Sequence, residues 1–196
     1  MSENKNPLNK ISYNSPVILT YALICLIALV VNFITGDRLN NLLLVARPHA
    51  SLLNPLTYLR SILYIFGHSG LKHFTSNMML FLLVGPVAEE RYGSQNLILM
   101  IGTTAIITAV INGLFFTHGI IGASGIVFML IILSSFANAE KGKIPLSLIL
   151  VAICYLGTEI FNGIFTKDNI SQFAHIAGGV MGIIWGLIMQ NRKSSV

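Results

Sequence analysis

Long apolar stretches separated by short polar ones set the pattern of this sequence. A helix needs about 20 mostly apolar residues to cross the hydrocarbon core of a membrane. Six stretches meet or approach that length, and they cover residues 16–35, 74–88, 97–116, 119–137, 144–165 and 173–189. Most connections between them are short and polar, which favours antiparallel neighbours in a bundle. The pattern therefore predicts an all-α polytopic membrane protein, built as a bundle of six transmembrane helices.

One connection, residues 36–72, is much longer than the others. Pro48, Pro55 and several arginines break it too often for a spanning helix, whereas the apolar runs 42–46 and 62–66 make it too hydrophobic for a free linker. Irregular backbone is tolerated at membrane depth only where protein or an interface covers it. We therefore expect this first loop to lie partly embedded in the membrane.

Composition agrees with a membrane protein and sets the expected orientation. Hydrophobic residues make up 54% of the chain and charged residues only 10%, against about 25% charged residues in a typical soluble domain. The formal charge of +5 comes from Lys and Arg scattered between apolar stretches, which argues against a nucleic-acid surface and points to membrane topology. If both termini are cytoplasmic, most of the Lys and Arg residues outside the long loop fall on the inner side. When the cations of the long loop are counted as well, the excess of positive charge on the inner side becomes smaller.

We accordingly expect residues 1–15 and 191–196 to be cytoplasmic tails and residues 16–190 to form the membrane domain. No small-residue cleavage motif follows the first apolar stretch, so that stretch is predicted to be a retained helix. The chain is short and shows no organelle-targeting segment or appended domain. These features favour the cytoplasmic membrane of a bacterium.

Four polar residues stand near the starts of the second, fourth and sixth predicted helices. They are His73 and Asn77, then Ser124 in the motif Gly-Ala-Ser-Gly at 122–125, and finally His175. In the expected topology these three helices all start at the outer surface, so the four side chains fall at similar depth. Polar groups within a membrane are costly and usually face a cavity or the bundle interior. The sequence thus predicts one site that opens to the outer side.

The residue types at this site suit acyl transfer. A serine hydroxyl becomes a nucleophile when a neighbouring base removes its proton, and histidine is the usual base. Ser124 and His175 are therefore the candidate nucleophile and general base. His73, Asn77 and the Ser124 backbone N–H can donate hydrogen bonds to an oxyanion, assisted by the positive end of a helix.

Glycines surround both of these candidate residues. Gly178, Gly182 and Gly186 share one helix face, and small residues at this spacing let membrane helices approach closely. We expect this face to press the sixth helix against the fourth, and Gly122 and Gly125, which flank the serine, to be structural as well. Each feature also has a simpler explanation. A serine that opens a helix is most often an N-cap, an intramembrane histidine can bond a neighbouring helix, and a glycine stripe can serve packing alone.

Other kinds of site find little support. A zinc protease would need His-Glu-x-x-His or a comparable ligand set, and none occurs. An intramembrane aspartyl protease would need two aspartates in membrane helices, whereas Asp37 and Asp168, the only aspartates, lie in predicted loops. His68 and His118, at loop edges, are predicted to be solvated. We therefore expect no metal and no cofactor.

Four stretches together resemble the rhomboid family of intramembrane serine proteases. They are residues 68–77 (HSGLKHFTSN), 89–93 (EERYG), 122–125 (GASG) and 174–182 (AHIAGGVMG). Their order and their places on the second, fourth and sixth predicted helices are similar to the family as well. The resemblance implies a rhomboid-type six-helix bundle whose catalytic dyad is the serine–histidine pair, without a third acidic member. It implies the same oxyanion donors.

The resemblance also bears on residues outside the dyad. It gives Glu89 and Arg91 a structural role that ties the first loop to the inner end of the second helix. Two positions depart from the family pattern. A Trp-Arg pair is common in the first loop, and here the matching place is Leu59-Arg60. A tyrosine that stacks on the catalytic histidine is replaced by Phe128, whose ring can still stack but cannot donate a hydrogen bond.

The predicted activity is hydrolysis of peptide bonds in or near transmembrane segments of other membrane proteins, through an acyl-enzyme. Its partners would be transmembrane protein substrates and the lipid bilayer. Two alternatives belong to other classes. A non-catalytic rhomboid-like protein would bind membrane clients without cutting them, but such relatives usually lack the serine or the histidine. A small-solute transporter would want charges at mid-depth, and Glu159 lies near one end of a predicted span.

Overall fold

The computed structural model describes residues 12–136, 143–151, 153–154 and 169–192. Over these residues the chain is helical apart from loops and one isolated β-bridge. The principal helices are α1 (Pro16–Thr35), α2 (Pro55–Leu63), α3 (Leu71–Tyr92), α4 (Ser94–Phe115), α5 (Ser124–Ser135) and α7 (Asn169–Arg192), with two short helical turns, η2 (Asn40–Leu44) and η3 (Tyr64–Phe66). Residues 146–151 and 153–154 are also helical, residues 144–145 precede them as loop, and positions 152 and 155–165 of the predicted span 144–165 lie outside the described residues.

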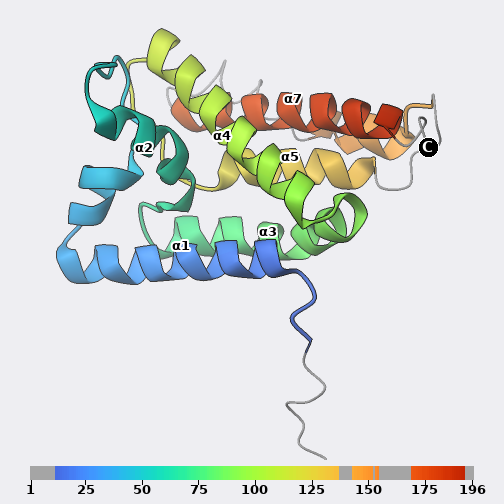
Figure 1. Cartoon of the computed structure of the whole chain (residues 1–196), viewed down its shortest axis with the longest axis horizontal. Coiled ribbons are helices and arrows are strands. Elements are labelled where there is room, and N and C mark those ends of the chain that lie inside the picture. Colours follow the sequence, from blue (N-terminus) through green and yellow to red (C-terminus); the bar gives the residue numbers. More distant parts are fainter. Residues whose placement is uncertain (1–11, 137–142, 152, 155–168, 193–196) are drawn as a thin grey trace, which may run out of the picture.

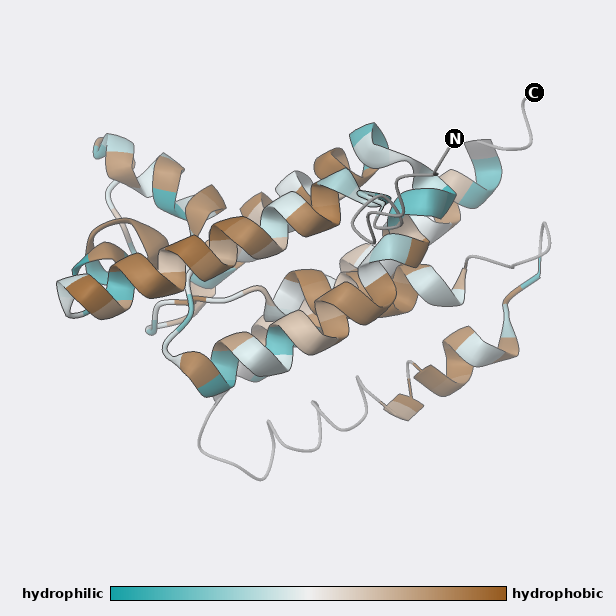
Figure 2. Ribbon diagram, turned by 90° about the horizontal axis from the view of Figure 1, so that it is seen from below, coloured by the Kyte–Doolittle hydropathy of each residue, from teal (hydrophilic) through white to brown (hydrophobic). Residues whose placement is uncertain are grey.

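The helices confirm the prediction of an all-α polytopic membrane protein. Within the described residues, three are long and apolar enough to cross a membrane: Pro16–Thr35, Ser94–Phe115 and Gln172–Asn191. α3 has the same length as α4 but carries polar residues at both ends. Hydrophobic residues run along the helices, and hydrophilic ones gather mainly at helix ends and in the loops (Figure 2).

α5 is the central helix of the bundle. Every residue from 125 to 133 is buried, and α3, α4 and α7 pack around the helix (Figure 1). Its 12 residues span only about 18 Å at 1.5 Å per residue, against roughly 30 Å for the hydrocarbon core. A helix this short cannot reach both membrane surfaces, so at least one of its ends lies within the bilayer.

A non-helical segment, residues 119–123, precedes α5 and occupies the beginning of the predicted span 119–137. Ile120 and Ala46 exchange both backbone hydrogen bonds at 3.0 Å. The Gly122 N–H donates to the Tyr64 carbonyl at 2.9 Å. These bonds to the first loop keep the segment out of the helix, which begins only at Ser124.

The long first loop folds back onto the bundle. Its elements η2, α2 and η3 contact one another, and α2 packs against α4. Arg60 is only 6% exposed and donates from both Nε and Nη2 to the Leu42 carbonyl, at 3.0 and 2.8 Å. Arginine donors in this forked geometry fix the chain around them. The loop is therefore anchored by Arg60, although leucine stands at position 59.

Glu89 ties the C-terminal end of α3 to two other helices. Its carboxylate accepts the N–H groups of Val17 and Ile18, both at 3.0 Å, and the Ser94 hydroxyl at 2.7 Å. A carboxylate at the first turn of α1 satisfies orphan amides and meets the positive end of the helix. The structural role of Glu89 thus differs from the expected link to the first loop. Arg91 lies in the last turn of α3.

Replacing Glu89 with alanine is expected to destabilise the bundle. The change leaves two amides of α1, one buried and one part-buried, without their acceptor, and hydrogen bonds to charged groups are worth about 1.5–3 kcal/mol each. We expect a loss of about 3 kcal/mol or more, measured as a lower midpoint of unfolding in mixed micelles. Glu90→Ala is the matched control, because Glu90 is exposed. Equal midpoints for wild type and Glu89→Ala would show that water replaces the carboxylate at no cost.

Candidate active site

The backbone around Gly122 presents Ser124 at the start of α5. Gly122 has φ 119°, a conformation that side chains with a Cβ rarely adopt. A Cβ there would also lie 2.7 Å from the Nε2 of His73 and 3.6 Å from the Nδ2 of Asn77. Glycine is thus required for two independent reasons. Ala123, not Ser124, occupies the N-cap position of α5, and no side chain caps the helix there.

Close packing of α7 on α5 brings His175 to the same place. A Cβ at Gly178 would overlap the backbone of Gly125, and one at Gly182 would lie 2.7 Å from the Met129 carbonyl oxygen. A Cβ at Gly125 would lie 3.0 Å from the carbonyl oxygen of Ala174. This helix pair has the most extensive contact in the described part of the chain. The expected role of the glycine face in packing agrees with this geometry.

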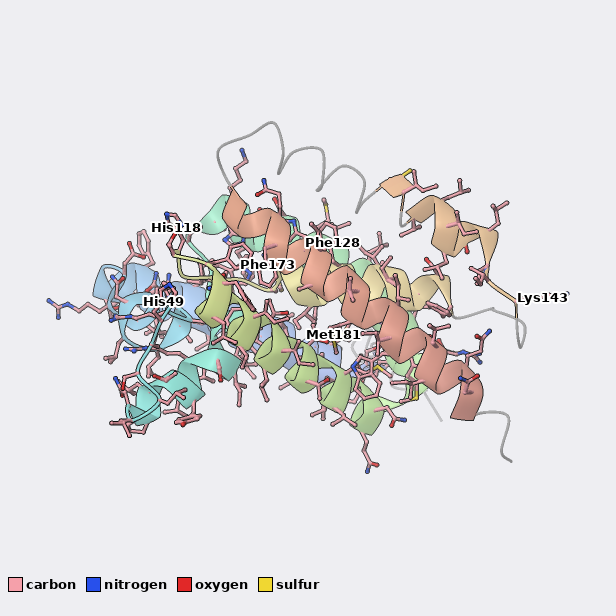
Figure 3. The ribbon with its side chains drawn as sticks, turned by 90° about the horizontal axis from the view of Figure 1, so that it is seen from above. His49, His118, Phe128, Lys143, Phe173 and Met181 are labelled. Carbon is pink, nitrogen blue, oxygen red and sulfur yellow. The ribbon has the colours of Figure 1, made fainter. Side chains whose placement is uncertain are left out.

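Aromatic rings fix the start of α7. The Phe128 ring lies where α5 passes beneath α7 (Figure 3) and stacks on the His175 ring, with centroids 4.4 Å apart and planes 6° apart. The Phe173 ring packs against Phe116 at the end of α4, at a centroid distance of 4.3 Å. Stacked aromatic pairs of this kind contribute about 0.5–1.5 kcal/mol beyond the area they bury. Phe128 therefore positions the imidazole through its face.

The predicted site residues surround one cavity of about 880 Å³. His73, Asn77, Ser124 and His175 all line it, and they come from the first two turns of α3, α5 and α7. The remaining lining residues are Ser69, Gly70, Leu71, Lys72, Ser76, Gly119, Ile120, Ile121 and Ala174. Residues that lie far apart in sequence thus converge at one end of the bundle. Among the described residues, no group of three or more His, Cys, Asp and Glu side chains could hold a metal ion.

Asn77 carries a buried donor beside this cavity. The residue is 8% exposed, and its Nδ2 has no hydrogen-bond partner among the described residues. A buried donor without an acceptor costs about 1–3 kcal/mol. The amide nitrogen lies on the Gly122 side of the cavity, next to the loop that presents Ser124. An oxygen atom bound there would satisfy it.

The sequence predicts a solvated His68, and this prediction is wrong. His68 is 1% exposed, and its ring packs edge-on against the rings of His73 and Phe74, at centroid distances of 5.1 and 5.4 Å. Burial, with a smaller contribution from His73, lowers the pKa of His68 to about 4. His68 is neutral at neutral pH and supports the His73 ring from behind. The sequence signal that could have indicated burial is that His68 belongs to the same motif as His73. His118 is exposed, as predicted.

Acidification is expected to destabilise the protein between about pH 6.5 and pH 4. His68 binds a proton near pH 6.5 in the unfolded chain but only near a pKa of about 4 in the folded one. In that window the unfolded state binds more protons, so stability falls as the pH drops. The measurement is the unfolding midpoint across this pH range. Its dependence on pH should be weaker in His68→Gln than in wild type and unchanged in His118→Gln. The same slope in His68→Gln and wild type would assign the acid sensitivity to other groups.

Comparisons with known proteins identify the family of this chain. Residues 55–192 match the model of the Rhomboid domain. Rhomboid-related protein 1 of Caenorhabditis elegans is 31% identical over 142 residues, which is 64% of this chain and 38% of that protein. The rhomboid protease GlpG of Yersinia pestis is 25% identical over 180 residues, which is 88% of this chain and 62% of that protein.

The chain spans less than two thirds of the length of either relative. The family model, however, covers more than half of the chain, including α2, α3, α4, α5 and α7. The helices that carry the four polar residues of the cavity all lie within the matched region. This integral membrane protein therefore belongs to the rhomboid family.

Proposed function

We propose that this chain is a serine endopeptidase that hydrolyses peptide bonds in or near transmembrane segments of other membrane proteins. The observation that carries the proposal is the presence of His73, Asn77, Ser124 and His175 around one cavity. They supply the nucleophile, the base and the oxyanion donors that acyl transfer requires. The protease activity named for the Yersinia relative supports the same reaction class.

The proposed reaction begins at the Ser124 hydroxyl. His175 removes its proton as Oγ attacks the scissile carbonyl carbon, and the carbonyl electrons move to oxygen to form a tetrahedral oxyanion. Collapse of this intermediate breaks the C–N bond, and His175 delivers the proton to the leaving amine. Water then attacks the acyl-enzyme with His175 again as base, which releases the new carboxyl terminus and restores the hydroxyl.

The oxyanion would form where donors already converge. Asn77 offers its buried Nδ2, which bonds no other described residue, and His73 offers Nε2 on the same side of Gly122. The Ser124 backbone N–H adds a third donor at the positive end of α5. Donors fixed before the reaction stabilise charge that develops only in the transition state, and each is worth about 10²–10³ in rate.

The proposed orientation places the cavity at the outer side of a bacterial cytoplasmic membrane, with both termini inside. The distribution of Lys and Arg outside the first loop supports it. A substrate helix hides its peptide bonds in its own hydrogen bonds, so cleavage requires local unwinding. Substrates should therefore carry helix-weakening residues near the scissile bond, and the family resemblance adds a small residue before it.

A mechanism-based serine probe tests this function directly. The purified protein in detergent, exposed to a fluorophosphonate, should be labelled once, and Ser124→Ala and His175→Ala should remain unlabelled. Ser135→Ala, at the other end of α5, is the matched control and should label like wild type. Equal labelling of Ser124→Ala would refute the assigned nucleophile. A wild type that retains a transmembrane client but neither labels nor cleaves it would be the non-catalytic client-binding protein instead.

A further inference from the structure

The Nδ1 atom of His73 faces Ser69, which lies four residues earlier in the sequence. The Ser69 backbone N–H points at this atom from 3.4 Å, and the Ser69 hydroxyl oxygen lies 3.1 Å from it. A backbone amide can only donate, so the ring nitrogen that receives it must offer a lone pair. In a neutral imidazole the proton is then on the other nitrogen, Nε2.

The protonated nitrogen is the one that faces the candidate nucleophile. Nε2 lies against the Gly122 backbone, since a Cβ at that glycine would come within 2.7 Å of it. Ser124 follows two residues later and lines the same cavity. With the proton on Nε2, His73 can donate a hydrogen bond to an oxyanion there. With the proton on Nδ1, Nε2 would present a lone pair and repel the same charge.

We propose that Ser69 is a positioning residue that holds His73 in the Nε2–H tautomer, the form required of an oxyanion donor. This inference rests on the proposed protease function. Ser69 itself does not touch the reacting atoms. It acts through His73. Other groups orient a metal-binding or catalytic imidazole in the same way, by a hydrogen bond to its second nitrogen.

The surrounding chain holds Ser69 in register for this contact. The His68 carbonyl, directly before it, accepts a hydrogen bond from the Asn40 Nδ2 at 3.0 Å. The Asn40 N–H in turn donates to the Asn32 Oδ1 at 3.0 Å. Gly70 then opens α3 as its N-cap residue, with His73 in the first turn. The serine is thus tied to α1 and to η2 on one side and to α3 on the other.

Histidine nitrogen resonances test the inference without relying on turnover. In protein labelled with ¹⁵N-histidine, with the His73 signals assigned by their loss in His73→Gln, wild type should show Nδ1 unprotonated and Nε2 protonated. Ser69→Ala keeps the amide but removes the hydroxyl, the second group that can donate to the Nδ1 lone pair, so the preference for the Nε2–H tautomer should weaken and the Nδ1–H population should rise. Turnover should fall roughly fivefold, the value of about one hydrogen bond, with little change in KM. Ser69→Thr should restore both.

Thr75→Ala is the matched control, because the Thr75 hydroxyl bonds the Lys72 carbonyl and not His73. It should leave the tautomer and the turnover unchanged. A wild type with the proton on Nδ1, or a Ser69→Ala tautomer ratio equal to that of wild type, overturns the inference even if the protein cleaves normally. The tautomer could instead depend on Ser69 in a wild-type protein that never cleaves a substrate. That result would overturn the proposed function, and the tautomer would then have no catalytic role.

Discussion

Replacing Ser124 with alanine is expected to lower cleavage of a transmembrane substrate by at least roughly 10⁴-fold. The change removes the atom that forms the acyl bond, and loss of a serine nucleophile in a dyad or triad costs up to about 10⁶ in turnover. His175→Ala should be about as damaging, because the imidazole acts through the serine. The double variant should be no worse than either single one. Turnover at saturating substrate in proteoliposomes is the measurement.

Substrate binding should survive this substitution. Ser124 contributes a small part of the cavity lining, and the oxyanion donors on α3 remain in place. The Ser124→Ala protein should therefore retain an uncleaved transmembrane substrate with an affinity close to that of wild type. Additive losses in the double variant would contradict a shared role, because two residues that act in one step cannot each cost the full amount independently.

The meeting of the four polar residues could be predicted from the sequence. His73, Ser124 and His175 stand near the starts of alternate apolar stretches, and alternate helices of an antiparallel bundle start at the same surface. That reasoning needs only the order of the spans and no knowledge of their packing. The cavity lined by these residues agrees with it.

Contacts between distant segments could not be predicted in the same way. Residues 119–123 are as apolar as the helix that follows, so hydropathy did not reveal that Ile120 pairs with Ala46 and delays the start of α5. Glu89 accepts a hydrogen bond from the amide of Val17 across 72 residues of sequence, a partner that no local pattern indicates. His68 looks like a loop residue because its burial comes from rings on α3 and a folded first loop.

Replacing Gly178 with leucine is expected to abolish activity by separating α7 from α5. Any Cβ at this position would overlap the Gly125 backbone, and backbone cannot move aside as a flexible side chain can. Helices forced apart would withdraw His175 from Ser124, and a misplacement of about 1 Å already costs roughly 10²-fold in rate. Overpacking in a tight core also costs about 1–3 kcal/mol. Turnover and unfolding midpoint should therefore both fall, and Gly178→Ala should show the same effects in weaker form.

Gly102→Leu is the matched control for this substitution. Gly102 also lies within an apolar helix, α4, but a Cβ there would meet no atom within 4 Å. The same added side chain should therefore leave both turnover and midpoint close to wild type. Full activity in Gly178→Leu would mean that α5 and α7 can separate without parting the serine from the histidine. In that case the stacking of Phe128 on His175, and not the glycine contact, would hold the imidazole in place.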